Sequence, residues 1–205
     1  MNKNILSIET TSDICSVGLF SNKKLLSIKE DTNRNHSSSL GLFVEQIFKK
    51  NPDLSLNSLD AIALSIGPGS YTGLRIGCSF AKGLAFSLSK PIIPINTIES
   101  LNNSIDDSNY FIVLGAYKDY FFIQEYNNGK KYNNVTFDRI DSIKNNQNIY
   151  GYNPNKINKN MIEILPSATK VFEVAYNNYN NYISYDIKSI KPNYIKPIQF
   201  KKNIS

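Results

Sequence analysis

The chain opens with apolar runs separated by short polar turns, a pattern that predicts an antiparallel three-stranded meander. The turns are of Thr-Thr-Ser-Asp and Ser-Asn-Lys type, which favour a reversal of the chain. The three apolar runs cover residues 4–9, 15–20 and 24–30. Between His36 and Lys50, apolar residues then recur at spacings of three and four. This spacing places them on one face of an amphipathic helix.

A second unit of strand and helix completes this part of the chain. The continuous apolar run at 61–66 is typical of a buried parallel strand, and it ends at a Gly-Pro-Gly turn. We expect a helix from about Thr72, a candidate N-cap, to Ser89, and a short strand that begins at Pro91. The order βββαβα therefore predicts an α/β lobe at residues 1–101.

The rest of the chain carries weaker and more aromatic strand signals. Two runs, at 110–117 and 120–126, flank Lys118-Asp119 and predict a hairpin. Two further strands and a helix are expected at 148–152, 161–165 and 167–178. Residues 102–109 are rich in Asn, Ser and Asp and are predicted to be a linker. A second, smaller lobe with a basic C-terminal tail should then occupy 110–205.

Composition and charge narrow the class of protein. Hydrophobic residues make up 41% and charged residues 20% of the 205 residues, which is an ordinary globular balance. No secretion signal is recognised, and no window approaches the about 20 apolar residues of a membrane span, so we expect a cytoplasmic protein. The net charge of +6 includes a run of lysines without an intervening acid, at Lys188, Lys191, Lys196, Lys201 and Lys202. Such a tail is either a solvated end or a contact for RNA phosphates.

The segment from Gly67 to Gly77 lies between a predicted strand and a predicted helix, where phosphate-binding loops occur. The dinucleotide fingerprint requires a glycine at the position of Thr72, and no Gly-Lys-Ser/Thr triplet of a Walker loop follows. The segment therefore fails as a nucleotide loop.

The following helix carries a ridge of small residues at four-residue spacing, which we call the small-residue ridge. Its members are Gly73, Gly77, Ala81 and Ala85. Glycine within a helix costs about 1 kcal/mol relative to alanine, so a backbone is expected to approach this face closely. That backbone could belong to the chain's own sheet or to a partner's helix.

Several segments together resemble the bacterial TsaB (YeaZ) family. They are Ile8-Glu9-Thr10-Thr11-Ser12, His36-Ser37, Ser65 to Gly77, Ala81-Lys82-Gly83-Leu84-Ala85, Asn96 to Leu101 and the closing Pro192-Asn193-Tyr194-Ile195-Lys196. The string Gly-Pro-Gly-Ser-Tyr-Thr-Gly-Leu-Arg is long enough to be a specific signal. The resemblance covers the first hundred residues well and the rest loosely.

The resemblance implies an actin-like (ASKHA) fold of two related lobes and a role in forming threonylcarbamoyladenosine at adenosine 37 of tRNAs that read codons beginning with A. In that pathway the paralogue TsaD is the enzyme, and it binds metal through a His-x-x-x-His pair. TsaB is its heterodimer partner, and the ATPase TsaE is a third component. The chain would then act on tRNA indirectly, through the complex. Pairing of the chain with itself is a further possibility.

The residues at the expected catalytic positions argue against an enzyme. In the TsaD alignment the histidine pair falls on Thr97 and Leu101, neither of which replaces an imidazole ligand. His36 is the only histidine, and a capping or interface contact explains it more simply than a lone base. We therefore predict no catalytic, cofactor-binding or metal-binding residues. An ATP-binding or ATP-hydrolysing actin-like enzyme is the alternative, although Glu9-Thr10-Thr11-Ser12 lacks the glycine of a phosphate-binding hairpin.

The proposed partner contact involves the two helices of the first lobe, which would pack against the equivalent helices of TsaD. The predicted interface residues are His36, Leu40, Phe43, Val44, Ile47, Gly73, Gly77, Phe80, Ala81 and Leu84. A bulky residue at Gly77 or Ala81 is expected to abolish co-purification with TsaD and to leave the fold intact.

Overall fold

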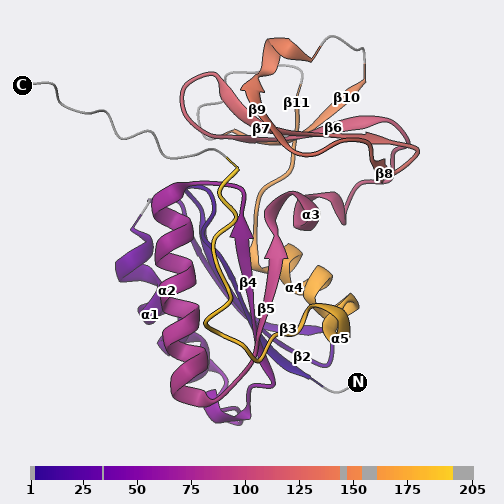
Figure 1. Cartoon of the computed structure of the whole chain (residues 1–205). Coiled ribbons are helices and arrows are strands. Elements are labelled where there is room, and N and C mark those ends of the chain that lie inside the picture. Colours follow the sequence, from indigo (N-terminus) through magenta and orange to yellow (C-terminus); the bar gives the residue numbers. More distant parts are fainter. Residues whose placement is uncertain (1–2, 34, 144–146, 154–160, 196–205) are drawn as a thin grey trace, which may run out of the picture.

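A five-stranded sheet forms the centre of the first lobe in this computed structural model, which describes residues 3–33, 35–143, 147–153 and 161–195 (Figure 1). Its strands are β1 (Asn4–Glu9), β2 (Cys15–Ser21), β3 (Lys24–Asp31), β4 (Ala61–Gly67) and β5 (Ile92–Asn96). Their spatial order is β3-β2-β1-β4-β5. The first three strands are antiparallel neighbours, whereas β1, β4 and β5 run parallel. The predicted meander and the order βββαβα are confirmed.

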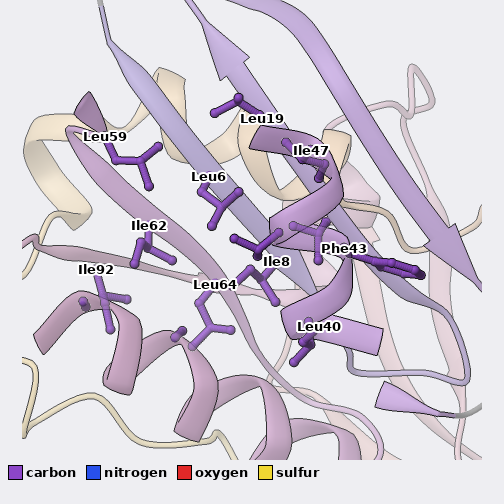
Figure 2. Packing of buried hydrophobic residues seen from close by; sticks show 14 of the residues in the cluster. Leu6, Ile8, Leu19, Leu40, Phe43, Ile47, Leu59, Ile62, Leu64 and Ile92 are labelled. Carbon is purple, nitrogen blue, oxygen red and sulfur yellow. The ribbon is translucent and has the colours of Figure 1, made fainter. Parts of the chain in front are cut away.

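Helices cover both faces of this sheet. One face carries α1 (His36–Lys50) and α2 (Tyr71–Leu88), and the other carries α4 (Ala168–Asn177) and α5 (Tyr179–Tyr182) (Figure 1). Strand periodicity explains the two layers, because Leu6 and Ile8 point to the α1–α2 side and Ile5 to the α4 side. Figure 2 shows Leu40, Phe43 and Ile47 of α1 packed toward the first of these layers.

The second lobe is built on a six-stranded sheet, several of whose strands are short. Its strands are β6 (Tyr110–Gly115), β7 (Tyr120–Asn127), β8 (Lys130–Lys131), β9 (Thr136–Arg139), β10 (Asn148–Tyr152) and β11 (Met161–Glu163). The order is β11-β10-β6-β7-β8, with β9 paired to β7. Each lobe also contains one short 3-10 helix: η1 (Leu56–Ser58) precedes β4 in the first lobe, and η2 (Ile140–Ser142) follows β9 in the second. The expected hairpin at Lys118 is confirmed by the antiparallel pairing of β6 and β7.

Helix α3 (Thr97–Asn102) lies between the two sheets and was not anticipated from the sequence (Figure 1). Its residues Ile98 and Leu101 are fully buried in the same cluster as Tyr110 and Ile112 of the second sheet. Its N-cap is Asn96, whose side chain accepts a hydrogen bond from the backbone N–H of Glu99 at 3.2 Å. The helix therefore connects the cores of the two lobes.

The structure corrects two predictions, the start of helix α2 and the lobe to which helix α4 belongs. Helix α2 begins at Tyr71 rather than after Thr72, because Ser70 is the N-cap and its hydroxyl accepts from Gly73 N at 3.3 Å. Helix α4 was expected within the second lobe, yet it packs on the first sheet, where Phe172 stacks on Phe20 at 3.9 Å between ring centroids. Burial of this aromatic face outweighs the proximity of α4 to β11 in the sequence.

The last described segment, residues 184–195, runs alongside α2 in space. We call it the C-terminal strap. It begins with a backbone bridge between Ser184 and Ile92, and it continues with Asn193 N donating to Ile66 O at 2.7 Å. Figure 1 shows this yellow segment beside α2 and along the β5 edge of the sheet. The predicted tail residues Lys196, Lys201 and Lys202 lie outside the described residues. Within the described ranges, no helix is long and apolar enough to cross a bilayer.

Candidate functional site

The turn between β1 and β2 packs directly against the start of α2. Thr10 and Thr11 are buried, and the hydroxyl of Thr10 donates to the carbonyl of Gly73 at 2.9 Å. The backbone N–H of Ser70 donates to the carbonyl of Thr11 at 2.6 Å. A Cβ at Gly69 would overlap the backbone of Thr11, so only glycine permits this approach. The hydroxyls expected of a phosphate-binding turn are thus engaged within the chain.

Glu9 ends β1 beneath this turn and is fully buried. Its Oε1 atom accepts from both the backbone N–H and the hydroxyl of Thr11. Its Oε2 atom has no hydrogen-bond partner among the described residues. Burial raises the pKa of this carboxyl above its ordinary value, and the two bonds from Thr11, with smaller contributions from the Ser65 side chain and the Thr10 backbone, oppose that shift only in part. A carboxyl that is buried and already accepts two hydrogen bonds within the chain is poorly placed to bind a metal–nucleotide complex.

His36 has a structural contact in this region. Its side chain is buried, and Nε2 lies 2.9 Å from the carbonyl oxygen of Ser12, which makes Nε2–H the donor. Its Nδ1 atom is also buried and has no partner among the described residues. The ring therefore links the start of α1 to the β1–β2 turn. His36, which was predicted to contact a partner, is therefore buried within its own lobe.

The two positions to which the family resemblance assigned a histidine pair, Thr97 and Leu101, are part of the core. Thr97 and Leu101 are both fully buried, and the hydroxyl of Thr97 is 2.9 Å from that of Ser65. Leu101 packs under the second sheet. Among the described residues, no three His, Cys, Asp or Glu side chains are grouped closely enough to hold a metal ion. Neither side chain at these positions offers the imidazole nitrogen of a histidine ligand.

The small-residue ridge packs against the chain's own β1–β2 turn. A Cβ at Gly73 would overlap the carbonyl oxygen of Thr10, and one at Gly77 would overlap its hydroxyl. Ala81 is fully buried in the α1–α2 core. The close approach is thus intramolecular, and a bulky residue at Gly77 should damage the fold, contrary to the sequence-based expectation.

The apolar face of α1 is likewise internal. Leu40, Phe43, Val44 and Ile47 are buried in the same core (Figure 2). Of the predicted interface residues, Phe80 and Leu84 alone keep a partly exposed side chain.

The exposed sides of the same helices form a surface that the sequence reasoning missed, which we call the outer face. It comprises Gly41, Leu42 and Phe48 of α1 together with Ile76, Phe80 and Gly83 of α2. Leu42 is 49% exposed. No atom lies within 4 Å of the position that a Cβ would take at Gly41 or Gly83. The available signal was Gly41, the single glycine of α1, and Gly83, the glycine of α2 that lies outside the four-residue row.

An apolar groove runs along the α1 part of this surface. It encloses about 480 Å³ and is lined by Gly41, Val44, Glu45, Phe48, Lys49 and Leu56. Only Glu45 and Lys49 are charged, and they pair with each other at 2.6 Å. The groove can therefore accept an apolar side chain of a neighbouring molecule.

Comparisons with known proteins agree in one family. The family model for TsaD, described as tRNA N6-adenosine threonylcarbamoyltransferase, matches residues 24–184. The tRNA threonylcarbamoyladenosine biosynthesis protein TsaB of Haemophilus influenzae is 36% identical over 100 residues, which are 49% of this chain and 42% of that protein. TsaB of Escherichia coli is 34% identical over 97 residues, 47% of this chain and 42% of that protein. The matched region thus spans less than half the length of these curated relatives.

Solved structures extend the similarity across both lobes. YeaZ from Pseudomonas aeruginosa superimposes with a TM-score of 0.73 and 20% identity, covering 94% of this chain and 100% of that one. A second Pseudomonas aeruginosa protein, described as similar to peptidase YeaZ, gives a TM-score of 0.76 at 18% identity, covering 95% and 100%. The fold is accordingly the two-lobed, actin-like α/β fold.

Proposed function

Because the chain belongs to the tRNA N6-adenosine threonylcarbamoyltransferase (TsaD) family, as a TsaB (YeaZ) member, we propose that it is the non-catalytic partner of a TsaD-type subunit. In this role it activates threonylcarbamoyl transfer to adenosine 37 of tRNAs that read codons beginning with A. It does so by forming a heterodimer with the catalytic subunit, while a TsaE-type ATPase serves as the third component.

Two features of the site support a role without chemistry. The positions of the catalytic histidine pair carry Thr97 and Leu101, both packed in the core. The hydroxyl of Thr10 is hydrogen-bonded to the carbonyl of Gly73 on α2 and is therefore engaged within the chain rather than directed at a phosphate. The alternative of an ATP-hydrolysing enzyme predicts saturable heat on titration of the chain with Mg-ATP at millimolar concentration. We expect none.

The observation that carries the proposal is the open glycine on the outer face of each helix. A glycine in a helix interior costs about 1 kcal/mol relative to alanine. At Gly73 close packing requires it, but at Gly41 and Gly83 nothing within the described chain does. Helices that pack across a partner interface use such small residues to bring their axes closer. The exposed Leu42 and the neighbouring groove supply apolar area for the same contact.

Co-purification with the TsaD-type subunit of the same organism tests this assignment. Gly41→Leu and Gly83→Leu place bulk on the outer face, and we expect both to abolish the complex while the melting temperature is retained. Asn181→Leu is the matched control, because Asn181 is exposed on α5, on the opposite face of the sheet. If the leucine variants bind the subunit as the control does, the outer face is not the interface.

Reconstitution of the modification tests the function itself. We expect threonylcarbamoyladenosine to form on tRNA when the TsaD-type and TsaE-type subunits are combined with this chain, and not without it. Full activity in its absence would remove the proposed role. Sedimentation of the chain with and without the subunit separates pairing with TsaD from pairing with itself, since a homodimer would use the same outer face.

A further inference from the structure

A second surface lies on a different flank of α2, along the C-terminal strap. The helix residues Tyr71, Arg75, Cys78 and Lys82 follow one another at spacings of four, three and four, so they share one side. Three residues of this row contact the strap: the ring of Tyr71 meets Tyr194, Cys78 approaches the carbonyl of Ile190, and Lys82 Nζ donates to that carbonyl at 3.1 Å. Ile76 and Phe80, on the outer face, are outside this row.

The charge of this surface is strongly one-sided. Helix α2 contains no acidic residue, and the described part of the strap contains only Asp186. Arg75, Lys188 and Lys191 are all exposed. The ion pairs found among the described residues are Lys3–Asp60, Lys49–Glu45 and Arg139–Asp119, so none of these three cations is neutralised by a carboxylate there. The surface therefore attracts a polyanion.

Two exposed aromatic rings accompany these charges. Tyr71 and Tyr194 lie 5.2 Å apart between ring centroids and are 38% and 43% exposed. The guanidinium of Arg75 lies 5.4 Å from the centre of the Tyr71 ring and donates to its hydroxyl at 3.2 Å. These contacts hold three flat groups together at one end of the surface. Unpaired RNA bases stack on such tyrosine rings and guanidinium planes.

We propose that this basic edge, formed by Tyr71, Arg75, Lys188, Lys191 and Tyr194, binds RNA directly. The cations contact phosphates, and an unpaired loop base stacks on the cluster of Tyr71, Arg75 and Tyr194. The choice of RNA among polyanions rests on the proposed function. Because the edge and the outer face occupy different flanks of α2, the chain can contact RNA and its partner subunit together.

Fluorescence anisotropy of the full chain with a synthetic anticodon stem-loop RNA tests the charges. We expect the double variant Arg75→Glu with Lys191→Glu to bind at least about tenfold more weakly at low salt, and the slope of log affinity against log salt to fall by about 1.4 for two lost phosphate contacts. Lys130→Glu with Lys131→Glu is the charge-matched control, since these two exposed lysines lie on β8, at the edge of the second sheet. Equal affinity of the double variant and the control would overturn the proposal.

A second variant separates stacking from charge. Tyr71→Leu with Tyr194→Leu should weaken RNA binding by about tenfold and leave the salt slope unchanged. Heparin, which has charges but no bases, should bind this variant and the wild type equally. If heparin and RNA respond alike to the tyrosine changes, the surface is a general polyanion site and the assignment to RNA is wrong.

Co-purification keeps this inference distinct from the proposed function. We expect both double variants to retain the TsaD-type subunit, because the outer face is unaltered. Unchanged RNA binding by the variants would overturn the basic edge alone, whereas modification without the chain would overturn the proposed function alone.

Discussion

On the inner face of α2, Gly73 and Gly77 lie against Thr10, whereas Gly83, on the exposed side of the same helix, has no atom within 4 Å of the place where its Cβ would be. The residue type is identical and the backbone is equally helical. The inner pair is needed so that a turn of the chain can reach the helix axis. The outer glycine has no such neighbour in the described chain, and the Gly41 position on α1 matches it.

The difference shows that the role of a glycine-rich helix face depends on which atoms pack against it. Inside the lobe, a missing Cβ makes room for the Thr10 hydroxyl and the carbonyl that receives its hydrogen bond. On the outer face, the same omission leaves a solvent-exposed backbone that a second molecule can cover. Stability and partner binding should therefore respond to substitutions on opposite sides of one helix.

Gly73→Ala should have the largest effect on stability. Its new Cβ would overlap the backbone carbonyl of Thr10, which cannot rotate away, and such overpacking costs about 2 to 3 kcal/mol. Urea denaturation of the purified chain measures this loss. An unaltered midpoint would break the comparison, because it would show that the turn can move away from the helix.

Thr10→Val examines the same contact from the other side. The variant keeps the branched shape but loses the hydroxyl that donates to Gly73 O, and it places a methyl group in the space left by Gly77. We expect a loss of about 1 to 2 kcal/mol in the free energy of unfolding. Thr10→Ser, which retains the hydroxyl, should recover most of that loss, and a serine variant as unstable as the valine variant would contradict the hydrogen bond.

Gly83→Ala adds the same methyl group as Gly73→Ala, but on the outer face of α2. With open space around the new Cβ, the better helix propensity of alanine should raise the free energy of unfolding by about 0.5 to 1 kcal/mol. Thermal denaturation beside Gly73→Ala gives the direct contrast. If both substitutions destabilise the chain, the outer glycine has an intramolecular role.

Glu9→Gln gives the smallest effect, and its sign depends on pH. Burial raises the pKa of Glu9 above 4.5, so the folded chain holds a proton that the unfolded chain releases as pH rises past that value. The wild type therefore loses unfolding free energy as pH increases, and the neutral glutamine does not. The melting temperature of the variant, relative to wild type, should increase between about pH 5 and about pH 7. A difference that stays constant with pH would show that the buried carboxyl does not titrate differently on folding.

Periodicity predicted the first lobe well, because strands of period two and helices of period 3.6 leave distinct patterns. Its limit appears at helix α4, which was predicted as a helix from 167 to 178 but assigned to the wrong lobe. Its apolar stripe specifies that one face is buried, not which sheet buries it. The stacking of Phe172 on Phe20 links residues far apart in the chain, and no local pattern encodes that pairing. Helix α3 was missed because a single short helix gives too little periodicity.

The candidate site was also predicted in part: the sequence indicated a close approach to α2 but not which segment makes it. The four-residue spacing of Gly73, Gly77 and Ala81 correctly indicated a close approach, and both an internal and an external neighbour fitted that spacing. The turn at Thr10, which comes more than sixty residues earlier, is the actual neighbour. The basic edge was only partly predicted: Lys188 and Lys191 were recognised as part of a basic run, but Tyr71 and Tyr194 meet only after the strap returns along α2.

The return of α4 and the strap to the first sheet also has a consequence for biosynthesis. The strands of that sheet are complete once the ribosome has passed Asn96, but Ile5, Phe20 and Ile93 remain uncovered until α4, more than seventy residues later, has emerged. In between, the nascent chain presents an apolar sheet face to other molecules in the cell. Translation speed through the second lobe therefore sets how long this face stays exposed before α4 can cover it.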